Sequence, residues 1–571
     1  MEKRKGYPRL KWVVYVLIVI AGLFSFAFVD DLFLISKNLD TFASIYKEIN
    51  LSYVDEVNTS KLMKTGIDAM LAELDPYTQY VPESEMEDFK LKFVSSEYDG
   101  IGVKIGARNG KVFISEIFEN FPAQQAGMQV GDEILEINHV GLKEKSPDQA
   151  SLMLKGPQNT PLDLLISRMG HSKPIEVHLV RVDIKQSSVP YYGLLAEHIG
   201  YIKLDRFQVN AAQDVTNGLL DLRKHKLNGL VLDLRDNGGG MVAEAIKLVN
   251  VFVNRGIKVA VQKGRHQDQI TVYQTTAEPV DMHLPLVVLM NSNSASASEI
   301  VAGALQDLDR AVIIGQRSFG KGLVQQTINM PYNSLLKITI AKYYTPSGRC
   351  IQALDYAHRE ASGDATKVAD SLMREYKTKA GRSVYDGNGI YPDIFIKPMD
   401  YHAITKVLIN KDYIFDYATK FRSEVGKIGE AKNFRLSDAD YEKFVLYLST
   451  KDYSYDTPTE LALSELIDEA MKEGTASQIK AELEALRVKV YHSKKSDLSQ
   501  FQDEVRAVLE NEIVSRYYFE RGRFEQSFQY DKEVQEALKV VTNKATMTTI
   551  LGGVGTYKII GKPDGNFSDN N

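Results

Sequence analysis

One serine lies where a predicted strand gives way to a predicted helix. Ser296 follows the apolar run at 284–290 and precedes a helical pattern over 298–308. Such a junction presents a hydroxyl beside the free N–H groups of a helix N-terminus, where negative charge is stabilised. Acyl transfer needs this arrangement because its oxyanion must meet fixed hydrogen-bond donors. Ser296 is therefore a candidate nucleophile.

The same segment has a purely structural interpretation. Ser296 and Glu299 form an S-x-x-E capping box, in which the serine only satisfies the helix N-terminus. The G-x-S-x-G motif of the α/β-hydrolases is missing, and no histidine lies near Ser296 in the sequence. A Ser-His-Asp triad therefore has little support, and the segment alone does not decide between a cap and a nucleophile.

A lysine is the known substitute for histidine as the base. Lys321 stands between two glycines in the segment at 315–322. A lysine base must be neutral, and burial among apolar neighbours favours the neutral form. The glycines permit tight packing, and Phe319 supplies apolar cover. Gln325 is a candidate orienter because a carboxylate in its place would keep the lysine protonated.

A Walker A phosphate loop is the rival interpretation of this lysine. The spacing from Gly315 to Gly320 and Lys321 matches that motif, but Gly322 replaces the Ser or Thr that binds magnesium. The residues at 336–341 then alternate like a strand, and no helical pattern follows the loop. The sequence therefore disfavours an NTPase.

A glycine-rich loop follows a third apolar strand. The sequence DLRDNGGG at 233–240 ends a strand and opens a helical pattern. Its three glycines allow backbone N–H groups to approach a ligand closely. A simple tight turn explains the loop equally well in isolation. Beside Ser296, Gly240 becomes a candidate oxyanion donor.

The elements that must position these residues alternate between strand and helix. Strand patterns at 230–234, 284–290 and 311–315 alternate with helical patterns at 241–254 and 298–308. This order predicts an α/β layer with a partly parallel sheet. A preceding segment of about 85 residues has short alternating strands and two short helices. The chain after residue 398 is mostly helical and polar.

Together these segments resemble the C-terminal processing, or tail-specific, proteases. The matching motifs are LDPYTQY at 74–80, GYIKL at 200–204, DLRDNGGG at 233–240, SASASEI at 294–300, FGKGLVQQ at 319–326 and DGNGIYPD at 386–393. The resemblance covers residues 32–398. It implies an α/β crotonase-like protease core of mixed sheet and helices, with an inserted PDZ domain and flanking helical regions.

The resemblance also implies roles for the candidate residues. Ser296 is the nucleophile, Lys321 the base and Gln325 its orienter, and the family's spacing of 25 positions from serine to lysine is met. The amides of Gly240 and Ala297 are expected to form the oxyanion hole. No metal and no other cofactor is expected.

The PDZ domain is expected at 98–184. The sequence GMQVGDEILEIN at 127–138 is similar to a typical PDZ stretch. Gly100, Ile101 and Gly102 stand where PDZ domains hold the carboxylate-binding loop. Such a loop holds the terminal carboxylate of a peptide that adds as a strand to a sheet edge. The expected partners are therefore protein or peptide substrates with free C-termini.

The N-terminus predicts export. Five basic residues precede an apolar run at 12–29, which is close to the length of a spanning helix. Positive charge before the run predicts that the rest of the chain lies outside the cytoplasm, on the periplasmic side. The segment serves either as an anchor in the inner membrane or as a signal peptide, with small residues for cleavage around Ala27.

Composition narrows the partners and the domain count. The net charge of −6 gives no general attraction to nucleic acid, and the single cysteine, Cys350, excludes an intrachain disulfide. The expected order is an export segment at 1–31, a helical region at 32–97, the PDZ domain at 98–184, the Ser-Lys core at 185–398, a helical region at 399–560 and a disordered tail at 561–571. A homo-oligomer built through the C-terminal helices and a solvated helical appendage both remain open.

The sequence thus predicts a serine endopeptidase that binds C-terminal tails through its PDZ domain and hydrolyses peptide bonds with a Ser-Lys dyad. The alternative is a non-catalytic, membrane-tethered PDZ scaffold. The intact set of Ser296, Lys321 and Gln325 favours the enzyme. Acyl-CoA chemistry on a crotonase-like scaffold is a third option, which export and the PDZ insertion disfavour.

Overall fold

The computed structural model describes residues 33–86, 89, 98–143, 145–266, 268–360, 363–490 and 494–563. The expected export segment at 1–31 and residues 564–571 of the expected tail lie outside this range. Across the described part of the chain, the structure contains no helix with the length and apolar character that a membrane crossing requires. The chain divides into two units, one of which comprises the residues up to Tyr80 together with Thr327–Ile338.

The described residues of the first unit are largely helical up to Ala72. A helix covers residues 33–52, and α2 follows at Thr59–Ala72. The side chain of Asn58 caps α2 by accepting the N–H of Lys61 at 2.9 Å, which satisfies one of the free donors of the first turn. The short strand β1 (Gln79–Val81) ends this part of the chain.

The second unit begins with a small mixed-β domain. Its main sheet has the order β3-β4-β5-β7-β8, with β6 beside β5, so that β3 is an edge strand. Strand β2 pairs with β9. The elements are β2 (Tyr98–Gly100), β3 (Val103–Arg108), β4 (Lys111–Ile117), α4 (Pro122–Gln125), β5 (Glu133–Ile137), β6 (Val140–Gly141), α5 (Pro147–Leu154), β7 (Pro161–Ser167), β8 (Ile175–Val180) and β9 (Val182–Ile184).

A six-stranded sheet forms the centre of the α/β part. Its order is β10-β11-β12-β15-β16-β23, in which β10 is antiparallel to β11 and the remaining neighbours are parallel. Strands β12 and β15 are buried along their whole length, as their continuous apolar runs predict. The strands are β10 (Tyr191–Ala196), β11 (Ile199–Lys203), β12 (Gly229–Asp233), β15 (Leu286–Met290), β16 (Val312–Gly315) and β23 (Ile394–Phe395).

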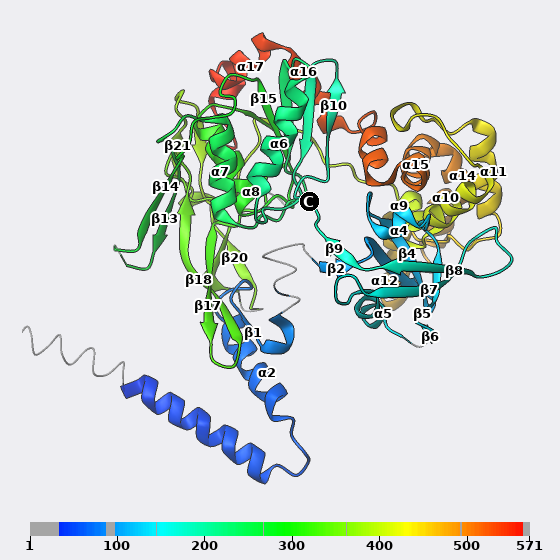
Figure 1. Ribbon diagram of the computed structural model, residues 1–571, viewed down its shortest axis with the longest axis horizontal. Helices are drawn as coiled ribbons and strands as arrows, with labels where there is room; N and C mark the ends of the chain where they lie inside the picture. The colour runs from blue at the N-terminus through cyan, green and yellow to red at the C-terminus, as the bar shows by residue number, and fades with distance from the viewer. Residues whose placement is uncertain are drawn as a thin grey trace, which may run out of the picture. The chain divides into compact units, whose positions relative to one another are not determined.

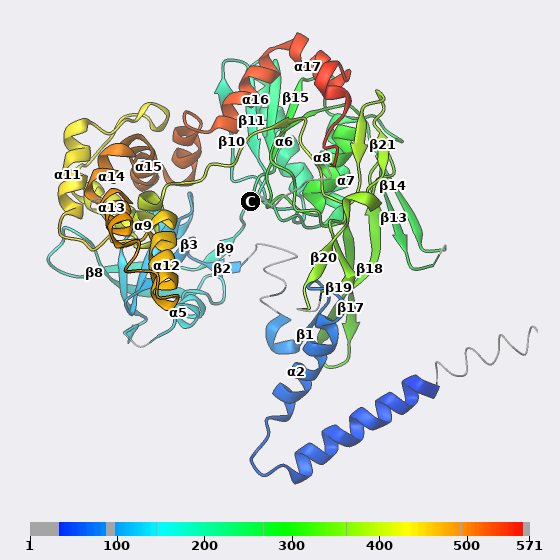
Figure 2. The same cartoon turned by 180° about the vertical axis from the view of Figure 1, so that it is seen from behind.

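Helices cover both faces of this sheet. On one face α6 (Ala211–Arg223), α7 (Val242–Phe252) and α8 (Ala297–Asp307) bury a large apolar cluster. On the other face the sheet packs against α16 (Lys532–Thr542) and α17 (Lys544–Leu551). Figures 1 and 2 show these two late helices, coloured red, against the green strands. The end of the chain therefore completes the core that begins near residue 190.

The remaining strands form smaller sheets around the core. Strand β13 pairs antiparallel with β14 and with residues 341–344 of β18. The segment after Lys321 is strand β17, and the absence of a helix directly after Lys321 agrees with the departure from the Walker motif. The strands are β13 (Lys258–Gly264), β14 (Ile270–Gln274), β17 (Leu323–Met330), β18 (Ser334–Tyr344), β19 (Leu354–Arg359), β20 (Ala365–Lys367), β21 (Glu375–Lys377) and β22 (Ser383–Tyr385).

A helical bundle follows the core and has its own apolar cluster. Its members are α9 (Ala403–Asn410), α10 (Tyr413–Glu424), α11 (Asp438–Leu448), α12 (Pro458–Lys472), α13 (Lys480–Val490), α14 (Lys494–Gln500) and α15 (Gln502–Ser527). Short 3-10 turns occur at η1 (Glu83–Glu85), η2 (Asp370–Leu372), η3 (Ala431–Asn433) and η4 (Gly555–Lys558). Helix α15 leads to α16, which connects this bundle to the six-stranded core sheet.

Candidate active site

Ser296 lies at the sharp turn between β15 and α8. Its backbone has φ 56° and ψ −112°, a conformation that residues other than glycine rarely adopt. Its side chain is half-buried. Local strain of this kind concentrates at functional sites and persists only where the surroundings enforce it. The hydroxyl is therefore held at the N-terminus of a buried helix.

Hydrogen bonds fix the backbone of Ser296 on both sides. Its N–H donates to Oε2 of Glu299 at 2.7 Å. Its carbonyl accepts the hydroxyl of Tyr343 at 3.0 Å and the N–H of Ile300 at 3.0 Å. These contacts impose the strained conformation.

Glu299 contacts two loops at once. Its carboxylate is fully buried, with 0% of the residue exposed. Oε1 accepts the hydroxyl of Ser318 at 2.6 Å and the N–H of Gly320 at 2.7 Å. Oε2 accepts the N–H of Lys321 at 2.9 Å in addition to that of Ser296. Burial raises the pKa of Glu299, and these four donors oppose that rise.

The shared oxygen brings the serine and lysine backbones together. Because Oε2 lies 2.7 Å from the nitrogen of Ser296 and 2.9 Å from that of Lys321, the two nitrogens are less than about 6 Å apart. The N–H of Phe319 also donates to the carbonyl of Ser294 at 3.1 Å. Two segments far apart in sequence thus form one rigid site.

The glycines on either side of Lys321 are required by close packing. A Cβ on Gly320, whose φ is +85°, would lie 2.4 Å from the Cβ of Ala353. A Cβ on Gly322 would lie 2.8 Å from the backbone nitrogen of Gln352. Lys321 itself is half-buried. Gln325 lies on β17, where its amide donates to the hydroxyl of Thr339 at 3.1 Å.

The glycine-rich loop packs directly against residues 294–300, the segment that contains Ser296 and is called the serine segment below. The carbonyl of Asn237 accepts the N–H of Ala295 at 3.0 Å and the hydroxyl of Ser298 at 2.8 Å. A Cβ on Gly239, whose φ is +99°, would lie 2.8 Å from the Cβ of Ser296 and 2.9 Å from the nitrogen of Ala297. The glycine that touches the serine is therefore Gly239.

The two residues expected to supply oxyanion donors flank this contact. Ala297 is buried as the first residue of α8. Gly240 is exposed and follows Gly239, and a Cβ on it would lie 2.4 Å from the carbonyl oxygen of Phe207. Both residues thus stand next to Ser296 or next to the glycine in contact with it.

The expected peptide-binding loop lies in the mixed-β domain. Gly100 ends β2, Ile101 is buried, and Gly102 precedes the edge strand β3. The carbonyls of Ile101 and Gly102 accept the N–H groups of Ala123 at 3.0 Å and Phe118 at 2.9 Å. The loop is thus fixed to the domain on its carbonyl side, beside a strand whose other edge has no partner strand within the described part of the chain.

Sequence reasoning treated Glu299 only as half of a cap and passed over Gly239 and Tyr343. The S-x-x-E spacing was a usable signal for Glu299, since it showed that a carboxylate belongs beside the serine. Nothing in the sequence showed that the same carboxylate also holds the N–H of Lys321. The role of Tyr343 depends on a strand that no local pattern connects to the serine.

Three family models match parts of this chain. Residues 198–357 match the model of peptidase family S41, and residues 88–167 match the PDZ domain. Residues 404–541 match the model described as "Probable PDZ-protease, C-terminal helical domain". The chain is thus a serine-type peptidase with a PDZ domain, and its mixed-β domain is that PDZ domain.

Two related proteins show which family of serine peptidases this chain belongs to. A carboxy-terminal-processing protease of Bartonella bacilliformis is 35% identical over 322 residues, which span 56% of this chain and 73% of the relative. A probable CtpA-like serine protease of Staphylococcus aureus is 33% identical over 317 residues, which span 55% of this chain and 62% of the relative. The chain belongs to the carboxy-terminal-processing protease family, which confirms the resemblance.

Solved structures with local similarity include a photosystem II D1 C-terminal processing protease. It is 26% identical, with coverage of 57% of this chain and 90% of that chain and a TM-score of 0.32. The PDZ domain of a carboxy-terminal protease from Vibrio cholerae, solved with a peptide, is 23% identical and has a TM-score of 0.15. That match covers 16% of this chain and 99% of the other.

Proposed function

We propose that this C-terminal processing protease works through a Ser-Lys dyad. Lys321 removes the proton of the Ser296 hydroxyl, and the oxygen attacks a peptide carbonyl. The amine leaves with a proton returned by the lysine, and water then hydrolyses the acyl-enzyme. Gln325 orients the lysine. The observation that carries this proposal is Oε2 of Glu299, which accepts the N–H groups of both Ser296 and Lys321.

The oxyanion hole is proposed to consist of the amides of Gly240 and Ala297. Two features support this assignment. The N-terminus of α8 favours negative charge, and the glycine loop lies against Ser296 through Gly239. A pair of fixed donors at this position would stabilise the tetrahedral intermediate.

The PDZ domain is proposed to capture the substrate tail. The edge of β3 is available for strand addition, and Gly100, Ile101 and Gly102 stand at its beginning. A peptide added there would place its terminal carboxylate at that loop. The enzyme would then cut tails that the PDZ domain has selected.

Three further expectations are part of the proposal. The core sheet with helices on both faces supports a crotonase-like architecture. The basic residues before the apolar run at 12–29 support an extracytoplasmic location on the periplasmic side, with the run anchored in the membrane or cleaved. Assembly into a homo-oligomer through the C-terminal helices stays a prediction. The match to peptidases leaves the scaffold alternative without support.

The full chain with a peptide substrate tests the dyad. Ser296→Ala and Lys321→Ala should each remove most of the activity, and Lys321→Arg should not restore it because arginine stays protonated. Full activity in either alanine variant would rule out the dyad. Activity should also fall at acidic pH as the lysine protonates, and a profile flat down to about pH 4 would contradict Lys321 as base.

Tail recognition has a separate test. The same substrate is compared with a free C-terminal carboxylate and with an amidated C-terminus. The free carboxylate should be cleaved faster, since only it can be held by the loop at 100–102. Equal rates would remove tail recognition while leaving proteolysis intact.

A further inference from the structure

Arg235 connects the end of core strand β12 to the start of α16, 298 positions further along the chain. Its Nε donates to the carboxylate of Asp233 at 3.0 Å. Its Nη1 lies 2.8 Å from the carboxylate of Asp531 and also donates to that of Glu533. One cation therefore faces three carboxylates, two of which come from the C-terminal helical region.

Glu533 has a second partner in the protease core. Its Oε1 accepts the side-chain amide of Gln316, which also donates to the carbonyl of Ile396 at 3.0 Å. The backbone N–H of Gln316 donates to the carbonyl of Met290 at 3.0 Å. Gln316 directly follows β16 and precedes Lys321 by five positions. The carboxylate of Glu533 thus contacts the start of the loop at 316–322, which carries Lys321 and is called the lysine loop below.

Arg235 lies near the start of the glycine-rich loop at 233–240. The next residue, Asp236, accepts the side-chain amides of Asn291 and Asn293 at 2.9 Å each. Asn237 and Gly239 then contact the serine segment as described above. Glu533 therefore contacts Arg235 and Gln316, each of which lies at the start of a loop next to Ser296.

Helix α16 fixes the position of these carboxylates. Asp531 caps the helix by accepting the N–H groups of Glu533 and Val534 at 3.0 Å each. The helix then packs its apolar face into the cluster that covers the back of the core sheet. Because α16 is anchored in this way, a carboxylate on its first turn has little freedom to move. The position of the helix therefore restricts the positions of Arg235 and Gln316, which contact Glu533.

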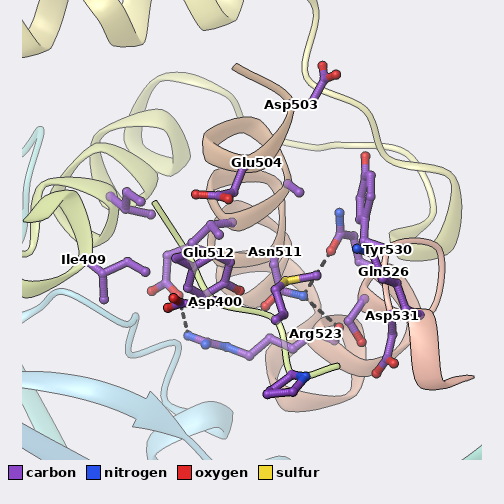
Figure 3. A pocket seen from close by; sticks show the side chains of 18 of the residues that line it. Asp400, Ile409, Asp503, Glu504, Asn511, Glu512, Arg523, Gln526, Tyr530 and Asp531 are labelled. Carbon is purple, nitrogen blue, oxygen red and sulfur yellow. Dashed lines mark hydrogen bonds and ion pairs between the residues drawn. The ribbon is translucent and has the colours of Figure 1, made fainter. Parts of the chain in front are cut away.

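The charges depend on each other. The side chain of Arg235 is 15% exposed and that of Glu533 is 13% exposed. Removing one partner from a pair this deeply placed leaves a charge without compensation. The contact lies in the wall of a cavity of about 1000 Å³, and Figure 3 shows Asp531 among the side chains that line it.

We propose that Glu533, assisted by Asp531, is a positioning residue that the C-terminal helical region supplies to the active site. By holding Arg235 and Gln316 it keeps the glycine loop and the lysine loop in the geometry that the reaction needs. This inference rests on the proposed Ser-Lys function. It makes the docking of α16 a condition for catalysis.

The test compares Glu533→Gln with Glu536→Gln in the full chain. Glu536 lies on the same helix but pairs with exposed Lys539, so its variant is a matched control. In Glu533→Gln, kcat should fall about 10- to 100-fold, because small errors in the placement of catalytic groups are costly. KM should stay within about twofold, and the protein should remain folded because Arg235 keeps the carboxylates of Asp233 and Asp531. Glu536→Gln should match the wild type.

A folded Glu533→Gln variant with wild-type kcat, or with only KM raised, overturns the inference. If that variant does not fold, Gln316→Met decides, since it removes the amide that donates to Glu533 and to Ile396 and leaves every charge in place: a lowered kcat supports the inference and a wild-type kcat overturns it. Labelling of Ser296 by a serine-reactive phosphonate separates the two proposals. Labelling in the wild type with a normal Glu533→Gln rate rejects only the role of Glu533, whereas activity in Ser296→Ala rejects the dyad.

Discussion

The carboxylate of Glu299 accepts the backbone N–H of Lys321 at 2.9 Å, across 22 positions of sequence. A capping glutamate ordinarily serves only its own helix. Here the same oxygen also accepts the N–H of Ser296. The capping carboxylate therefore connects the segment of Ser296 to the loop of Lys321. The proximity of the serine and lysine segments is therefore set by one buried carboxylate.

Glu299→Gln should weaken both the site and the fold. The amide has one acceptor oxygen in place of two, so either Ser318 and Gly320 or Ser296 and Lys321 lose their acceptor. We expect the free energy of unfolding to fall by about 2–3 kcal/mol and kcat/KM to fall at least about tenfold. Urea unfolding and peptide hydrolysis measure these effects. The exposed Glu278 provides the control Glu278→Gln, and equal behaviour of the two variants would contradict the role of Glu299.

Gly239→Ala should disturb the serine without touching its side chain chemistry. The new methyl would lie 2.7 Å from the carbonyl oxygen of Ala295 and 2.8 Å from the Cβ of Ser296. We expect a loss of about 1–3 kcal/mol of stability from overpacking and a clear drop in kcat. At the neighbouring Gly238 a Cβ meets nothing within 4 Å, so Gly238→Ala should behave like the wild type. A fully active Gly239→Ala enzyme would show that this contact is dispensable.

The carboxylate of Asp233 should make stability depend on pH. Burial would raise its pKa, but the charges of Arg235 and Lys203 and the hydroxyl of Tyr201 lower it well below the ordinary value. The unfolded chain therefore binds more protons, and the stabilisation, complete above about pH 4, is lost as the pH falls.

At pH 7, Asp233→Asn should cost about 3–5 kcal/mol, the usual effect of breaking a buried pair. Urea unfolding at pH 7, 5, 4 and 3 measures the difference from the wild type, which should shrink below about pH 4. The exposed Asp268 gives the control Asp268→Asn. A difference that stays constant down to pH 3 would contradict the assignment.

Gly102→Ala should impair tail binding. A Cβ there would lie 2.4 Å from the Cβ of Phe121, and the φ of +79° disfavours any side chain. We expect KM for a substrate with a free carboxylate to rise about tenfold, with cleavage of its amidated form unchanged. Gly141→Ala, where a Cβ meets open space, serves as the comparison. Unchanged KM in Gly102→Ala would place the carboxylate elsewhere.

Much of the protease core could be predicted from local patterns. The apolar runs around Leu232 and Val288 predicted strands buried on both faces, and these are β12 and β15. Gly322 in place of a serine or threonine, with no helical pattern after it, predicted that no phosphate-binding helix follows Lys321, and the chain continues there as β17. Continuous hydrophobicity and turn residues are short-range signals, so they survive in the sequence alone.

Other features depend on the folded chain. The sequence alone pointed to Ser296 and Lys321 as the residues proposed to carry the chemistry, because their types and their spacing are fixed along the chain. Only the tertiary structure decided that Glu299 joins them and that Gly239 touches the serine. It also decided that α16 covers the back of the core sheet and brings Glu533 to Arg235. A periodic pattern shows that a face is apolar or that a carboxylate is near a helix end, but the partner that satisfies each group is chosen by packing between distant segments.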